Sequence, residues 1–156
     1  MSMSKTAFLF KLVLAAFLLF PPVQQAAASE PHTAEIWKDP NCGCCQAWAD
    51  HLKAAGFDVR IQETEEMNGV KAMNRVPAEL ASCHTAKIGG YVIEGHVPAS
   101  DIMRLLKEKP QVHGLAVPGM PLGSPGMEMP DGEKEAYDVM SFDEGGNAAV
   151  WSSHNN

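Results

Sequence analysis

The sequence predicts a mixed α/β fold with the element order β-α-β-α-β-β-α, followed by an irregular extension rich in Pro, Gly and Met. Two observations carry this prediction. Runs with strand or helix periodicity alternate up to about residue 109. After Pro110 the periodicity gives way to repeated Pro-Gly and Gly-Met steps, which regular helices and strands do not tolerate.

The predicted elements begin and end at residues that break the periodicity. Asp39-Pro40 ends the first strand, Gly56 ends the first helix, and Gly89-Gly90 forms a tight turn between the last two strands. Pro98 suits the first turn of the last helix, because its missing N–H needs no partner there. The elements are a strand at 34–37, a helix at about 45–55, a strand at 57–61, a helix at about 65–74, strands at 85–88 and 91–94, and a helix from 98 to about 109.

Apolar residues give each predicted helix an inner face. The residues expected on these inner faces are Trp48, Leu52 and Ala55, then Met67, Val70 and Met73–Asn74, and finally Ile102, Leu105 and Leu106. Glu94, on the last strand, is expected to face solvent. The order of the elements is the thioredoxin-like order, which places the end of the first strand next to the start of the first helix.

The C-terminal stretch, residues 113–156, is predicted to be an extension that packs on the thioredoxin-like domain formed by residues 29–112. Its segment 118–130 cannot form regular structure. Residues 137–142 alternate as a strand, and residues 148–151 are expected to pair back onto it. The last few residues are expected to fray.

Residues 1–28 have the pattern of a secretory signal peptide. Lys5 and Lys11 give a basic start, residues 12–20 are apolar, and Ala26-Ala27-Ala28 offers small residues for cleavage. The apolar run is short for a membrane span, so we expect an exported, periplasmic protein without a stable membrane anchor. Cleavage near Ala28 removes two lysines and no acid, which changes the net charge from −7 to −9 and excludes the electrostatic pattern of nucleic-acid binding.

Three of the four cysteines crowd into the segment Asp39-Pro40-Asn41-Cys42-Gly43-Cys44-Cys45. The fourth, Cys83, lies in Ser82-Cys83-His84-Thr85. Two structural disulfides are disfavoured, because only Cys83 lies outside the cluster and the remaining pair would be vicinal or Cys-x-Cys, both of them strained. Such thiol density indicates either a disulfide-exchange site or a soft-metal site.

The disulfide-exchange alternative rests on Cys42 and Cys45, which have the Cys-x-x-Cys spacing at the start of a helix. Cys42 would attack and Cys45 would resolve. Val76-Pro77 resembles the Ile-Pro whose cis proline faces the thiols of thioredoxins. Cys44 has no role in such an enzyme and would compete for either sulfur.

The metal alternative accounts for all four thiols. Structural zinc sites usually draw cysteines in two separated pairs, which this spacing does not offer. Cu(I) prefers thiolates and thioethers and can share bridging thiolates, so the pattern favours a multinuclear copper site. The cysteine candidates are Cys42, Cys44, Cys45 and Cys83, and the further candidate ligands are His84, His96, His113, Met120, Met127 and Met129.

The segments Trp37–Trp48, Ser82–Ala86, Gly90–Ala99 and Val117–Glu128 resemble the periplasmic CopG-type copper-resistance proteins. The resemblance spans about residues 36–142. It implies a thioredoxin-like fold and a copper cluster bridged by the four cysteines. It also implies a role in copper resistance through sequestration, transfer to other periplasmic copper-handling proteins, or copper redox cycling, so that a copper-dependent oxidoreductase remains an alternative.

Simpler roles compete for the histidines and methionines. His84 could be a strand histidine that faces solvent, and His96 could serve the turn before the last helix. His113 lies in a loop flanked by glycine, and His32, His51 and His154 are expected at the surface. Met120 and Met127 sit in Pro-Gly turns, an unusual place for core residues, which favours a methionine lid over the site.

Overall fold

The computed structural model describes residues 32–155. Residues Pro31–Asn156 form one compact unit. The expected signal peptide, residues 1–28, lies outside the described residues. Among the described helices, none has the length and hydropathy needed to cross a membrane.

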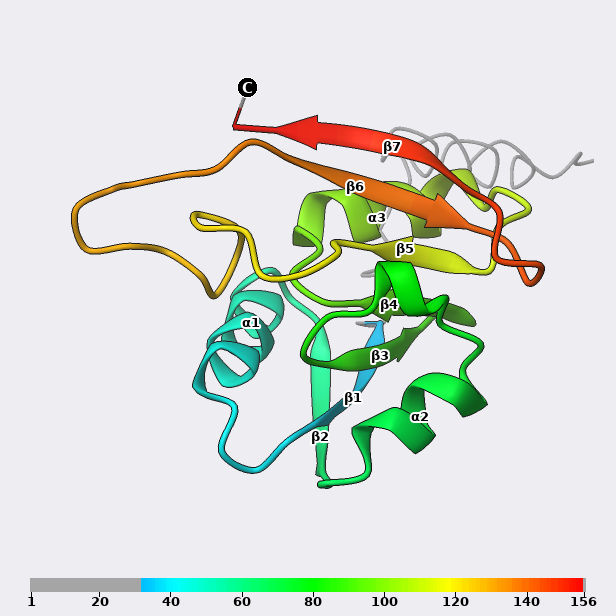
Figure 1. Cartoon of the computed structure of the whole chain (residues 1–156), viewed down its shortest axis with the longest axis horizontal. Coiled ribbons are helices and arrows are strands. Elements are labelled where there is room, and N and C mark those ends of the chain that lie inside the picture. Colours follow the sequence, from blue (N-terminus) through cyan, green and yellow to red (C-terminus); the bar gives the residue numbers. More distant parts are fainter. Residues whose placement is uncertain (1–31, 156) are drawn as a thin grey trace, which may run out of the picture. The chain divides into compact units, whose positions relative to one another are not determined.

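The elements follow the predicted order through the third helix, and the C-terminal stretch then adds three strands (Figure 1). They are β1 (Thr33–Lys38), α1 (Gly43–Ala54), β2 (Asp58–Glu63), α2 (Met67–Met73), the 3-10 helix η1 (Ala78–Leu80), β3 (Thr85–Ile88), β4 (Tyr91–Glu94), α3 (Ala99–Glu108), β5 (Gly114–Ala116), β6 (Tyr137–Phe142) and β7 (Ala148–His154). The fold is therefore mixed α/β, with one sheet and three α-helices.

The seven strands form a single sheet in the order β2-β1-β3-β4-β5-β6-β7. β1 and β2 run parallel, as do β4 and β5, and the other neighbours are antiparallel. The parallel pairs are joined through α1 and α3, since parallel strands need a crossover connection. β6 and β7 form a hairpin that extends the sheet at its C-terminal edge.

One face of the sheet packs on α1 and α3. Its centre consists of Trp48 and Leu52 from α1, Ile102 and Leu105 from α3, and the inward residues of the strands, such as Ile36. These side chains are fully buried. The helical periodicity of the sequence therefore predicted most of this core.

α2 covers the other face, where Leu80, Val92, Ala116 and Phe142 form a second, smaller cluster (Figure 1). Two predictions for this region are wrong. Met73 is 78 % exposed, because Val70 is the residue that this short helix buries. Glu94 is fully buried, because α2 covers the face on which its side chain lies.

The sheet register brings three chain segments to one end of the molecule. The end of β1 lies beside the start of β3, where Trp37 pairs with Thr85. The end of β4 lies there too, because Glu94 pairs with Thr85. The cysteine loop, the Cys83 segment and the turn after β4 consequently meet at this end.

Three local features differ from the sequence-based expectation. α1 begins at Gly43 with Cys42 as its N-cap, about two residues earlier than predicted. β7 runs to His154, so residues 152–154 belong to a strand rather than to a frayed end. Pro77 is trans, because the described residues contain no cis peptide bond, so the analogy with the cis proline of thioredoxins is not met here.

Candidate metal centre

The four cysteine sulfurs meet at the end of the sheet described above. Their Sγ atoms all lie within 4.8 Å of one another. Three of them come from the start of α1, and the fourth comes from the segment between η1 and β3. The structure thus brings Cys83 to the cysteine cluster across forty residues of chain.

The three clustered cysteines occupy the N-terminus of α1. Cys42 is the N-cap, and Cys44 and Cys45 lie in the first turn. The N–H groups of this turn have no partner within the helix, and the helix dipole is positive there. Both effects stabilise the negative charge that sulfur carries when it binds a soft cation.

A buried lysine holds the loop that leads into this helix. Lys38 is 2 % exposed, and its Nζ donates to the carbonyl of Asp39 at 2.9 Å and pairs with Glu63 at 3.2 Å. The Asp39 carboxylate accepts the Asn41 N–H, and the Asp39 carbonyl accepts the Cys42 N–H. Sequence analysis missed Lys38, although strand parity offered a signal, since it follows the buried residues Ala34 and Ile36 at two-residue steps.

Cys42 and Cys45 form a disulfide, whereas Cys44 and Cys83 are free. Cys44 Sγ lies 3.5 Å from Cys42 Sγ. A disulfide sulfur carries no thiolate charge, so all four sulfurs become metal donors only after a two-electron reduction of this bond. Cys44 and Cys83 remain thiols whether the Cys42–Cys45 bond is oxidised or reduced.

A second group of donors shares Cys83 with the first. Cys83 Sγ lies 3.2 Å from His84 Nδ1 and 3.1 Å from His96 Nε2. These three atoms also lie within 4.8 Å of one another. Cys83 therefore belongs to a cluster of sulfurs on one side and to a Cys-His-His group on the other.

Hydrogen bonding orients the His96 ring toward Cys83. Its Nδ1 donates to the carbonyl of Pro125 at 2.8 Å, since a carbonyl can only accept. Nε2 consequently carries a lone pair that faces Cys83. A backbone carbonyl on the far ring nitrogen is the usual support of a metal-binding histidine.

His84 is fully buried against the rings of Trp48 and His96, with centroids 4.3 Å and 5.0 Å away. Its Nε2 has no hydrogen-bond partner, which is rare for a buried polar atom. The structure thus rules out the solvent-facing strand position considered for His84. Its imidazole lies with its Nδ1 toward the candidate centre.

Burial also sets the protonation of these groups. It raises the pKa of the Cys83 thiol to about 12, with the Cys44 sulfur adding to the effect. It lowers the pKa of His84 well below the ordinary value, assisted by His96 and by Lys71, and it lowers the pKa of His96. Without metal, Cys83, His84 and His96 are therefore neutral, and soft cations would have to displace the Cys83 proton.

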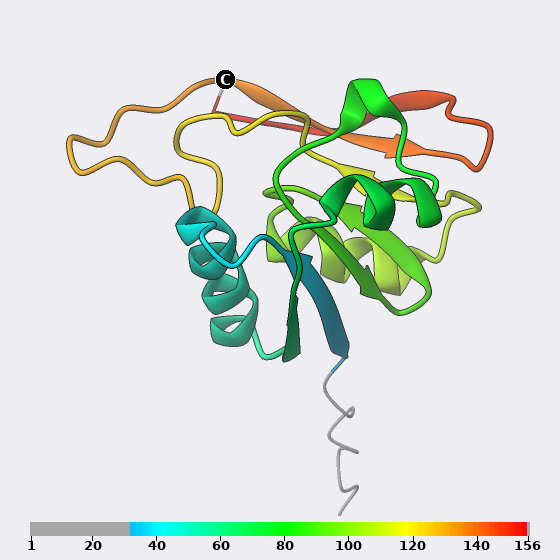
Figure 2. The same ribbon diagram turned by 60° about the horizontal axis from the view of Figure 1, so that its bottom comes forward.

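Residues 117–129, which we call the strap, follow β5 and pass beside the start of α1 (Figure 2). They contact the helix at Gly126 and the Cys83 segment at Gly119. The Ser82 hydroxyl donates to the Gly119 carbonyl, and the Gly119 N–H donates to Ala81. Pro125 accepts the His96 bond described above. The strap thereby ties the Cys83 segment to the turn after β4.

The strap also lies against α1 at Gly126. A Cβ at this position would come 2.7 Å from the Cys44 carbonyl oxygen and 2.8 Å from the backbone nitrogen of Trp48. The strap carries the three candidate methionines: Met120 is 51 % exposed, Met129 is 38 % exposed, and Met127 is partly buried. Met120 and Met127 thus follow directly after Gly119 and Gly126, the strap residues that contact the two cysteine segments.

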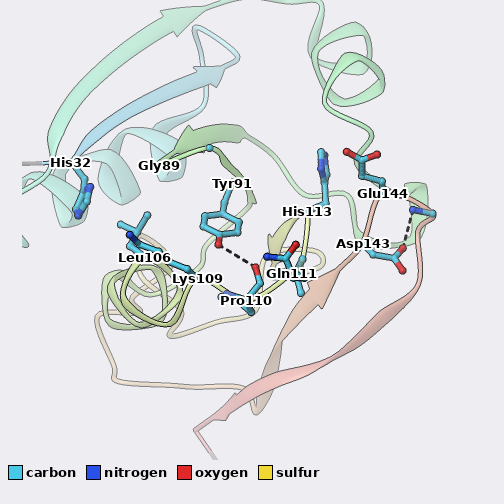
Figure 3. Close-up of a pocket in the computed structure, with 13 residues that line it drawn as sticks. His32, Gly89, Tyr91, Leu106, Lys109, Pro110, Gln111, His113, Asp143 and Glu144 are labelled. Atoms are coloured by element: carbon cyan, nitrogen blue, oxygen red, sulfur yellow. Dashed lines mark hydrogen bonds between the residues drawn. The ribbon is translucent and has the colours of Figure 1, made fainter.

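His113 lies at the opposite end of the sheet, because it precedes Gly114, which pairs with Val92 at the start of β4. Its Nε2 donates to the Asn74 carbonyl at 2.8 Å. It lines a surface pocket of about 950 Å³, together with Tyr91 and the turn after β6 (Figure 3). The structure therefore does not bring His113 to the other candidate ligands.

Two histidines expected at the surface have structural roles. The Ala99 N–H donates to His51 Nε2 at 3.2 Å, which satisfies a donor at the start of α3. His154 lies 2.8 Å from the Asp101 carboxylate and ties β7 to α3. His32, the third histidine expected at the surface, is exposed.

This chain is similar to one protein family and to two solved structures. The family described as "Protein of unknown function, DUF411" matches residues 80–127, the stretch that contains Cys83, both histidines and most of the strap. Two solved structures, described as forms 2 and 1 of "Copper resistance protein copG", are each 45 % identical to this chain with a TM-score of 0.76. They cover 80 % and 81 % of this chain, which spans 99 % and 100 % of theirs. No functionally curated protein matches significantly.

Proposed function

This chain belongs to the CopG family of copper resistance proteins, and on that premise we propose that it binds several Cu(I) ions as cargo between its four cysteines. One observation carries the proposal: Cys83 belongs to both donor groups. A thiolate can bridge two soft ions, and the two groups together offer six donors, whereas one tetrahedral ion takes four. Their sharing of a sulfur favours a multinuclear centre over a single ion.

The cysteines supply the negative charge, and His84 and His96 supply neutral nitrogen donors. Met120, Met127 and Met129 are candidate outer ligands, since thioethers suit Cu(I) and the strap carries them beside the centre. The partial exposure of these methionines supports an exchange route for copper at the strap side. The physiological effect would be to lower toxic copper by sequestration, by transfer to other copper-handling proteins, or by redox cycling.

The periplasm is the proposed site of action. The basic start, the short apolar run and the alanines of residues 1–28 support export and cleavage near Ala28. Intact mass of the protein recovered from the periplasm checks this proposal. A mass that retains residues 1–28 would contradict it.

A copper titration tests the function. Fully reduced protein should bind more than one Cu(I) per chain, measured by metal analysis after anaerobic titration and gel filtration. Cys83→Ala should lower the bound copper as much as the loss of any clustered cysteine, because it removes the shared ligand. A ratio of one or less, or unchanged copper in Cys83→Ala, would overturn the multinuclear centre.

A matched pair of histidine variants separates ligand loss from general effects. His96→Ala should weaken copper retention against a chelator, because Nε2 faces the shared sulfur. His113→Ala should leave retention unchanged, because its ring lies at the other end of the sheet. Equal behaviour of the two variants would remove His96 from the centre.

The Cys42–Cys45 disulfide favours a second candidate function, thiol–disulfide exchange. In that case Cys42 would attack a substrate disulfide and Cys45 would resolve the mixed disulfide. Cys44→Ser should then leave disulfide-reductase activity intact while Cys42→Ser abolishes it. Loss of copper binding in Cys44→Ser with no reductase activity in the parent protein would favour the copper function.

A further inference from the structure

The most buried charged group of the described chain lies directly behind the Cys83 segment. Glu94, the last residue of β4, is fully buried on the face of the sheet covered by α2. Its Oε1 lies 2.5 Å from the Nζ of Lys71, a residue of α2 whose side chain is 13 % exposed. A fully buried carboxylate is costly unless it is paired and hydrogen-bonded.

The remaining bonds of this carboxylate go to the residues on either side of Cys83 and His84. The Ser82 N–H donates to Oε1 at 2.7 Å, and the Thr85 hydroxyl donates to Oε2 at 2.7 Å. Lys71 Nζ also lies 3.2 Å from the Thr85 hydroxyl. Glu94 therefore accepts hydrogen bonds from both ends of the segment that carries Cys83 and His84.

Apart from the bonds that Ser82 and Ala81 make with Gly119 of the strap, this segment has few other supports. Residues 81–84 form neither helix nor strand, and they lie between η1 and β3. The Gly95 N–H donates to the His84 carbonyl, which again ties the segment to the end of β4. Val92 lies on the same face of β4 and packs in an apolar cluster there. An apolar side chain could therefore also pack at position 94, so the sheet does not require a carboxylate there.

We propose that Glu94, paired with Lys71, is a positioning residue of the copper centre that holds Cys83 and His84 in their ligand geometry before copper arrives. The proposal rests on the proposed copper function and deepens it. Groups that fix the orientation of metal ligands reduce the ordering that binding would otherwise require. Because Cys83 is shared by both donor groups, its placement affects every ion that it bridges.

The test compares Glu94→Gln with a matched control, Glu144→Gln. Glu144 pairs with Arg75 at 2.7 Å on the exposed surface, so its change also removes one carboxylate and one ion pair. Glu94→Gln keeps the size of the side chain but loses the pairing with Lys71 and the charge-assisted bond to Ser82. Its Cu(I) affinity, measured by chelator competition, should fall about 10- to 100-fold, as for other supports of metal ligands, while Glu144→Gln stays unchanged.

A second measurement needs no copper. In the reduced, metal-free protein, site-specific alkylation followed by mass spectrometry gives the rates at Cys83 and Cys44. Glu94→Gln should raise the Cys83 rate relative to the Cys44 rate, because only the Cys83 segment is released. A general loss of stability would raise both rates.

A folded Glu94→Gln variant with unchanged affinity and an unchanged rate ratio would overturn the proposal. Should this variant fail to fold, Thr85→Val removes a single bond to the carboxylate at nearly constant volume and should still raise the ratio; an unchanged ratio there overturns the proposal equally. Absence of copper binding in the unmodified protein would instead overturn the proposed function, and the alkylation ratio would still decide the role of Glu94.

Discussion

At the scale of single residues, Cys83 has the greatest influence on the centre, because it is the sulfur common to both donor groups. Its neighbours are neutral imidazoles, and its own thiol is held protonated by burial. Copper must therefore replace a proton at Cys83 but finds nitrogen lone pairs already free. Cys83 therefore contributes to the pH dependence of copper affinity, whereas the two imidazoles do not.

We predict that Cu(I) affinity rises with pH, with Cys83 contributing about one log unit per pH unit between about pH 7 and about pH 8, because the raised pKa keeps its thiol protonated throughout that range. Cys83→Ala should lower the slope by about one. His96→Ala should leave the slope unchanged, because the lowered pKa keeps this ring neutral there. Chelator competition at several pH values measures the slopes, and an equal slope in Cys83→Ala would contradict the prediction.

A second residue-scale prediction concerns the methionines. Met120→Leu should speed copper loss to a chelator, since leucine fills a similar volume without the thioether. Met103→Leu is the matched control, because Met103 on α3 is 47 % exposed and Met120 is 51 % exposed. Stopped-flow chelator kinetics distinguish them, and identical rates would return Met120 to an ordinary surface role.

The sequence predicted the cysteines and the two nearby histidines as candidate donors because the chemistry of these residues is visible in their type. It did not predict the residues that hold them. Lys38 and Glu94 are charged, and composition alone places charged residues in solvent. Only the structure shows that the loop after β1 buries Lys38 and that α2 buries Glu94.

At the scale of elements, the start of α1 and the strap determine the shape of the centre. The helix places three sulfurs at its positive end, and the strap closes on that end at Gly126. Gly126 has φ of 86°, and a Cβ there would meet backbone atoms rather than flexible side chains. The contact therefore cannot absorb a larger residue without movement of the strap.

Gly126→Ala should lower the free energy of unfolding by about 1–3 kcal/mol and accelerate copper release, because the strap must move away from α1. Gly132→Ala is the matched control, since Gly132 has φ of 78° but nothing within 4 Å of its Cβ position. Denaturant unfolding and chelator kinetics measure the two effects. If Gly132→Ala releases copper equally fast, backbone strain rather than the strap contact is responsible.

The regular elements up to α3 could be predicted from periodicity, but those after Pro110 only in part. β5 has three residues and begins with a glycine, so it has no measurable alternation. β7 extends beyond its predicted end because its last residues bond to α3, a contact distant in sequence. Pairing across the whole chain decides these strands, and local patterns do not contain it.

At the scale of the whole molecule, the sheet separates two regions. The donors lie where β1 and β4 end, and the pocket beside His113 lies where β4 and β5 begin. This pocket is thus remote from the candidate chemistry. His113 illustrates the limit of sequence analysis here, because its residue type matched a ligand while the topology put it at the other end.

The disulfide gives a prediction for the intact protein. The oxidised chain should bind fewer Cu(I) ions than the reduced chain, because Cys42 and Cys45 then offer no thiolate. The double variant Cys42→Ser/Cys45→Ser should bind equally little under both conditions. Metal analysis after titration, with and without prior reduction, measures the difference, and equal copper in both forms of the parent protein would contradict the prediction.

The strap has a consequence for the timing of assembly. The donors and their supports extend from Cys42 to Met129, so a partly synthesised chain exposes three adjacent thiols long before their later partners exist. The hairpin of β6 and β7 follows the strap and is made later than every one of these donors. Stable copper binding therefore requires the later segments. A chain that meets the ion before they are made offers only the three thiols near residue 44 and lacks Cys83, the histidines and the strap.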